Sequence, residues 1–82
     1  MEVPVRLSEL PAGGCFRVER ILLAREVGKR LADMGFNEGR RGVVVRRQLS
    51  GGPLQVGILG GSVLIRRSEA DGIEVGVLEG RC

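Results

Sequence analysis

The side chains that could perform chemistry are few, because the 82-residue sequence has no histidine, two cysteines and ten acidic residues. Histidine is the most common general base and a frequent transition-metal ligand, so a catalytic site and a transition-metal site would each lack their usual side chain. Cys15 and Cys82 have no CxxC spacing and no sequence neighbour that would activate a thiol. Glu69 and Asp71 are carboxylates two residues apart, but they follow an arginine pair and are predicted to be turn or solvent-exposed residues. We therefore expect no enzyme activity, and we assign no catalytic residue, metal ligand or cofactor.

Nucleotide binding is not expected either. Glycines are abundant, but no phosphate-binding loop of the G-x-x-x-x-G-K-[ST] type is present. The only lysine, Lys29, lies inside a predicted helix. If a nucleotide matters to the function, a partner supplies the pocket.

Three arginine doublets are the most notable polar feature: Arg40-Arg41, Arg46-Arg47 and Arg66-Arg67. Adjacent side chains of a strand point to opposite faces, so each doublet should direct at least one guanidinium outward. These are either solvated strand ends or a basic face that pairs with acidic groups. The net charge of +3 permits docking to an acidic protein, a phosphate or a lipid surface. The sequence lacks the concentrated basic stripe that is typical of a nucleic-acid-binding protein.

The start of the chain predicts a cytoplasmic protein. The sequence MEVPVRLSELP carries charges where a targeting leader would be apolar, and no apolar run is long enough to span a membrane. We expect no direct membrane insertion. In a reducing compartment, Cys15 and Cys82 are predicted to be free thiols, with one disulfide as the alternative.

Glycine and proline divide the chain into short segments that predict one mainly β domain over residues 1–82, with a core at about 7–78. A Gly60-Gly61 hairpin turn is expected between two apolar runs, and residues 67–71 resemble one helical turn with Ser68 as a cap. The expected strands are 15–23, 42–48, 54–59, 62–66 and 72–78. Five short strands and one inserted α-helix predict a small, partly closed antiparallel barrel, because closure removes exposed edges.

The inserted helix is predicted over residues 25–34, with Val27, Leu31 and Met34 on one face. Glu26 and Arg30 lie four residues apart on another face, in the order that favours an ion pair. Its end is well specified: Gly35 suits the left-handed position after the helix, and Phe36 would fold back onto Leu31 as in a Schellman motif. These side chains either plug the open end of the barrel or also support a docking surface.

At these residues the chain resembles a known family. The runs RLADMGFNEG (30–39), VVRR (44–47), Gly51 to Pro53 and LIRRSEADGIEV (64–75) are together similar to a FeoA-type domain. That resemblance implies an SH3-like barrel with an inserted helix. It also implies a non-catalytic accessory protein of bacterial ferrous iron uptake, whose partner is the FeoB-type membrane transporter.

Three positions depart from the family pattern. Glu38 stands where proline is frequent, Gly52 where an acidic or amide residue is common, and Gly61 where a larger side chain is usual. The first two are expected to loosen loops, and the third to favour a tighter hairpin.

The predicted partner surface combines outward groups of the helix, the turn that follows it and one arginine doublet. Its residues are Glu26, Arg30, Asn37, Glu38, Arg46 and Arg47, and the predicted cap and core residues beneath it are Leu31, Met34, Gly35 and Phe36. Two alternatives remain at this point: a nucleic-acid-binding SH3-like barrel, and a regulatory domain of a metal-dependent repressor. The aromatic content of 2% disfavours the first. The sequence leaves open homo-oligomer formation and whether the transporter is activated or inhibited.

Overall fold

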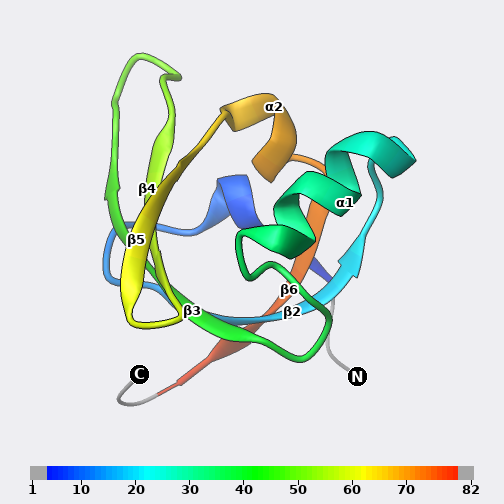
Figure 1. Cartoon of the computed structure of the whole chain (residues 1–82). Helices are drawn as coiled ribbons and strands as arrows, with labels where there is room; N and C mark the ends of the chain where they lie inside the picture. The colour runs from blue at the N-terminus through cyan, green and yellow to red at the C-terminus, as the bar shows by residue number, and fades with distance from the viewer. Residues whose placement is uncertain (1–3, 80–82) are drawn as a thin grey trace.

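Short antiparallel strands form one sheet that curls around an apolar core in the computed structural model, which describes residues 4–79 (Figure 1). The described strands are β1 (Val5–Arg6), β2 (Cys15–Ile21), β3 (Arg41–Arg47), β4 (Leu54–Ile58), β5 (Gly61–Ile65) and β6 (Ile73–Leu78). Their order in the sheet is β1-β6-β2-β3-β4-β5. The helices are the 3₁₀ helix η1 (Leu7–Glu9), α1 (Arg25–Asp33) and the single turn α2 (Arg67–Ala70). The predicted mainly β fold with one inserted helix is confirmed.

The inward face of the sheet is apolar, as the alternation within the strands requires. Phe16 and Val18 of β2 are fully buried, while Arg17 between them is exposed. Register shifts follow Val18 in β2 and Val44 in β3, and such bulges increase the local bend of a strand. They help a sheet of short strands to curl around its core.

Two elements at the start of the chain were not predicted. Residues 5–9, for which no helix or strand was predicted, form the two-residue strand β1 and the helix η1. Val5 lies opposite Val75 of β6, so β1 extends the sheet beyond the five expected strands. A two-residue strand is too short to show alternation in sequence.

The hairpin between β4 and β5 turns one residue earlier than expected. Ile58 pairs with Gly61, which already belongs to β5, and the two turn residues are Leu59 and Gly60. Both have positive φ, 54° for Leu59 and 77° for Gly60, as a type I′ turn requires. The predicted Gly60-Gly61 turn is therefore wrong, because a leucine occupies a left-handed position that normally favours Gly or Asn.

The end of α1 carries the hydrogen bonds of a Schellman motif. Phe36 N–H donates to the Leu31 carbonyl at 2.9 Å, and Gly35 N–H donates to the Ala32 carbonyl at 3.0 Å. Gly35 has a φ of 105°, and the side chains of Leu31 and Phe36 are fully buried in the same cluster. This stop seats Phe36 in the core and turns the chain toward β3.

Two one-turn helices use the same local arrangement. Arg6 N–H donates to Glu9 Oε1 at 3.0 Å at the start of η1, and Arg66 N–H donates to Glu69 Oε1 at 3.2 Å at the start of α2. The cap position of α2 is thus Arg66, and the expectation that Ser68 caps it is wrong. The buried Ser8 hydroxyl of η1 bonds Asp71 after α2, which joins the two helices.

Cys15 differs from its prediction. It is buried at the start of β2 and is bonded in a disulfide, so the expected free thiol at this position is wrong. Cys82 lies outside the described residues.

Candidate partner-binding surface

The predicted partner residues fall into two separate groups. Glu26 and Arg30 lie on α1, and Asn37 and Glu38 lie in the turn after it, which begins at Gly35 beside Ile58 and Leu59 of the β4–β5 hairpin. Arg46 and Arg47 instead pair with Gln55 and Leu54, at the opposite end of β4. Three to four residues of strand correspond to about 10–13 Å. The two groups do not form one compact patch.

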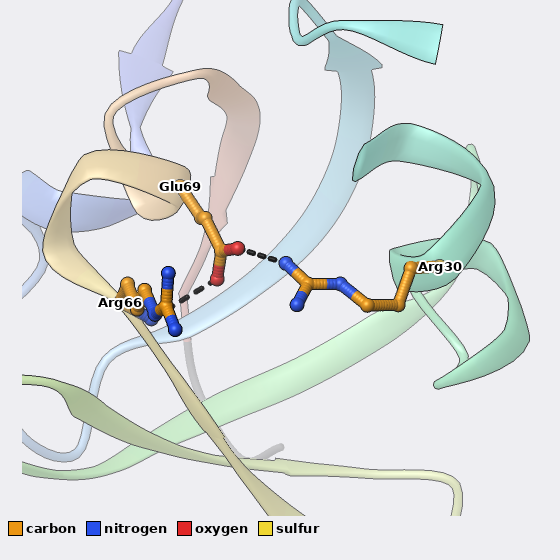
Figure 2. Close-up of polar contacts among 3 residues, drawn as sticks. All are labelled: Arg30, Arg66 and Glu69. Carbon is orange, nitrogen blue, oxygen red and sulfur yellow. Dashed lines mark hydrogen bonds and ion pairs between the residues drawn. The ribbon is translucent and has the colours of Figure 1, made fainter. Parts of the chain in front are cut away.

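Arg30 is held by α2 and not by its helix neighbour. Its guanidinium donates to Glu69 Oε2, while the other oxygen of that carboxylate accepts the Arg66 N–H at 3.2 Å (Figure 2). The Glu69 side chain is only 13% exposed, whereas that of Arg30 is 53% exposed. Arg30 thus connects α1 to α2 and still presents part of its surface. The spacing of Glu26 and Arg30 suggested a pair within the helix, but no such ion pair occurs among residues 4–79.

The turn after α1 is polar and exposed. Asn37 Nδ2 donates to the Ala32 carbonyl at 3.3 Å, which satisfies one of the last carbonyls of the helix. Glu38 is exposed and follows directly. The turn therefore offers an ordered amide and a carboxylate that a partner could reach.

Leu59 is a surface residue that the sequence reasoning missed. Its side chain is 60% exposed although its backbone lies in the left-handed region. A Cβ added to Gly35 would lie 2.6 Å from Leu59 Cδ1, so the leucine rests directly on the helix stop. The only sequence signal was the hairpin itself, and it placed the turn one residue too late. We refer to Arg30, Asn37, Glu38 and Leu59 as the helix-stop surface. Glu26, in the first turn of α1, lies outside it.

The second group contains one outward arginine and one tethered arginine. Arg46 is exposed, but Arg47 is half-buried and its guanidinium donates to the Leu10 carbonyl. This split follows the alternation of the strand. Arg46 can bind a partner freely, whereas Arg47 would first have to give up its hydrogen bond to the Leu10 carbonyl.

This difference predicts unequal effects on stability. Arg47→Gln should lower the free energy of unfolding by about 1 kcal/mol, because the Leu10 carbonyl loses a charged donor. The matched variant Arg46→Gln, on an exposed side chain, should change it by less than about 0.5 kcal/mol. Urea unfolding of both variants measures the difference. Equal midpoints would show that the Arg47 contact contributes nothing.

The described residues contain no convergent reactive groups. A shallow depression between β2 and β6 has two carboxylates at its edge, but Glu19 pairs with Arg17 at 3.2 Å and Glu74 with Arg20 at 3.7 Å. No cluster of three or more His, Cys, Asp or Glu side chains that could hold a metal ion was found within residues 4–79. None of the helices in that range is both long and apolar enough to cross a membrane.

Comparison with known proteins identifies the family. The model of the FeoA domain matches residues 5–77. The chain belongs to the FeoA domain family. The FeoA protein from Chlorobium tepidum is 37% identical, with a TM-score of 0.86 over 93% of this chain and 72% of that one. A search of the curated proteins found no match.

Two further solved structures show how widely this fold is used. FeoA from Stenotrophomonas maltophilia, a prokaryotic SH3 domain protein solved in complex with zinc, is 32% identical with a TM-score of 0.75, over 88% of this chain and 89% of that one. This confirms the expected SH3-like class. A manganese-dependent transcriptional repressor has a TM-score of 0.84 at 24% identity, over 95% of this chain and 38% of that one, and shares the fold alone.

Proposed function

We propose that this FeoA-family protein is a non-catalytic, cytoplasmic accessory protein of bacterial ferrous iron uptake that binds a FeoB-type membrane transporter. The observation that carries the proposal is the FeoA domain match over residues 5–77, which supports a role in ferrous iron transport. The FeoA proteins of known structure support it further. Glu19 and Glu74 are paired with arginines, and the described residues contain no cluster of side chains that could hold a metal ion. Both observations favour a protein that acts by binding another protein.

The alternative of a nucleic-acid-binding barrel is disfavoured by the aromatic residues. The sequence has two phenylalanines and no other aromatic residue. Both Phe16 and Phe36 are fully buried. Single-stranded nucleic acids usually stack bases on exposed rings, and this chain has none to offer.

We assign the transporter contact to the helix-stop surface. Leu59 combines solvent exposure with an unfavourable backbone conformation, and such strained residues concentrate at functional sites. Leu59 lies over Gly35, and the segment on either side of that glycine carries exposed polar groups that a partner can use, with Asn37 and Glu38 in the turn and Arg30 on α1. An exposed apolar centre with a polar rim is the usual anatomy of a protein interface. Arg46, at the far end of β4, is left out of this contact.

Leu59→Asn separates binding from folding. Asparagine tolerates the left-handed position of the turn, so this variant should raise the free energy of unfolding by about 0.5 kcal/mol. It should nevertheless weaken binding to the transporter's cytoplasmic region about tenfold, because an apolar contact is lost. Calorimetric titration with that region and thermal unfolding of the free protein measure the two effects.

The matched control is Leu22→Asn, at a leucine that is similarly exposed but lies outside the helix-stop surface. It should leave the affinity unchanged. If Leu59→Asn and Glu38→Lys both bind as tightly as the wild type, the assigned surface is wrong. If the wild type does not bind the transporter at all, the proposed function is overturned.

A further inference from the structure

The charges of this protein are unevenly distributed along the chain. Residues 39–68 contain six arginines and no acidic residue, whereas the rest of the sequence has seven basic and ten acidic residues. This acid-free segment forms three consecutive strands, β3, β4 and β5, which neighbour one another in the sheet. One part of the barrel is therefore strongly basic, although the net charge of the chain is small.

The same segment exposes large apolar side chains. Leu49 is 104% exposed, Leu64 is 67% exposed and Val45 is 48% exposed. Leu64 lies opposite Gln55, which in turn lies opposite Arg46, so an apolar and a basic side chain share one row across β5, β4 and β3. Exposed leucines in the same acid-free segment as the exposed Arg46 and Arg67 indicate a contact surface of defined chemistry.

The β3–β4 loop presents the most exposed of these side chains. Leu49 lies in this loop, which extends beyond α2 in Figure 1. The side chain of Gln48 packs over Gly52, where a Cβ would collide with it. The guanidinium of Arg67 lies 3.7 Å from the position that a Cβ of Gly51 would take, so one cationic group flanks the loop.

We propose that the face formed by Arg46, Leu49, Leu64 and Arg67 docks on an anionic lipid surface. Arginines near such a surface each contribute about 1 kcal/mol, and leucine side chains can enter the headgroup boundary beside them. A nucleic acid would satisfy the arginines but not the leucines. An acidic protein would have to enclose a leucine that projects on a convex loop, whereas a lipid surface accepts it directly. The contact is peripheral and involves no membrane-spanning segment.

The first test is sedimentation with lipid vesicles that contain no protein, so its outcome does not depend on the transporter. The protein should bind vesicles of mixed phosphatidylglycerol and phosphatidylcholine, be released by salt, and ignore pure phosphatidylcholine. Arg46→Gln and Arg67→Gln should each weaken binding about fivefold, and Leu49→Ser about tenfold.

Matched controls test the location of the contact. Arg25→Gln removes the same charge on the exposed start of α1, and Leu22→Ser removes an exposed leucine outside the acid-free segment. Neither should change vesicle binding. If Arg25→Gln weakens binding as much as Arg46→Gln does, only net charge matters and the proposed face is wrong. Absence of wild-type binding to the anionic vesicles would also overturn it.

A second test examines Leu49 itself. The sequence contains no tryptophan and no tyrosine, so Leu49→Trp introduces a single clean fluorophore at the loop. Its emission should shift to shorter wavelength on anionic vesicles, while that of Leu22→Trp should not. The loop is fully exposed at this position, so folding should be unaffected, which circular dichroism checks. An unshifted spectrum under conditions of full vesicle binding would refute the contact through Leu49.

Discussion

Phe36→Ala is expected to lower the free energy of unfolding by about 4 kcal/mol, the largest effect that we expect of a single substitution. Phe36 is fully buried and belongs to the same core cluster as Leu31 and Ile58. Its position is fixed by the hydrogen bond from its own N–H to the Leu31 carbonyl, so the backbone cannot easily move to fill the space. Removal of the ring therefore leaves a cavity beneath the helix stop.

The size of the domain makes this loss severe. A chain of 82 residues has a total stability of about 4 to 12 kcal/mol, so a loss of about 4 kcal/mol removes at least about a third of it. Urea unfolding followed by circular dichroism measures the change. Phe36→Leu, which retains most of the apolar volume, should lose less than about 1.5 kcal/mol. A loss below about 1 kcal/mol for Phe36→Ala would contradict the role of this ring in the core.

The fold was predictable where local signals agree. The β-branched alternation located the five longer strands, and the sequence Gly35-Phe36 after an amphipathic run coincides with the observed helix stop. The errors have local causes too. β1 is too short to show a period, and two consecutive glycines left the register of the β4–β5 turn undetermined.

The candidate surface was less predictable, because its contacts join residues that are distant in sequence. Arg30 pairs with a carboxylate 39 residues away, and Arg47 donates to a carbonyl 37 residues away. Helical spacing instead suggested a partner for Arg30 four residues away. Strand alternation did predict that one arginine of each doublet points outward, which holds for Arg46. Strand alternation could not predict that Arg47 donates to the Leu10 carbonyl.

The exposure of Leu59 illustrates the same limit. A hairpin turn normally carries Gly, Asn or Asp at this position, so its sequence signal is a preference for those residues. A leucine there contradicts the local rule, and only the folded structure shows that it lies over Gly35 and remains exposed. Violations of this kind are expected at functional positions, where local consistency is given up for contact with a partner.

Gly35→Val is expected to lower the free energy of unfolding by about 3 kcal/mol. The first cause is the backbone: Gly35 has a φ of 105°, a conformation that a β-branched residue adopts only with strain. The second is steric, because any Cβ here meets Leu59 Cδ1 at 2.6 Å. The leucine is largely exposed and can turn aside, so we expect the backbone to account for most of the loss.

Gly39 provides the comparison that separates these two causes. It has a similar φ of 89°, but a Cβ added there meets no atom within 4 Å. Gly39→Val should therefore show the backbone cost alone, and Leu59→Ala in the Gly35→Val background should recover the steric part. Thermal and urea unfolding of the three variants measure each contribution. An undiminished melting temperature for Gly35→Val would mean that the helix does not depend on a left-handed stop, and the support beneath the helix-stop surface would have to lie elsewhere in the core.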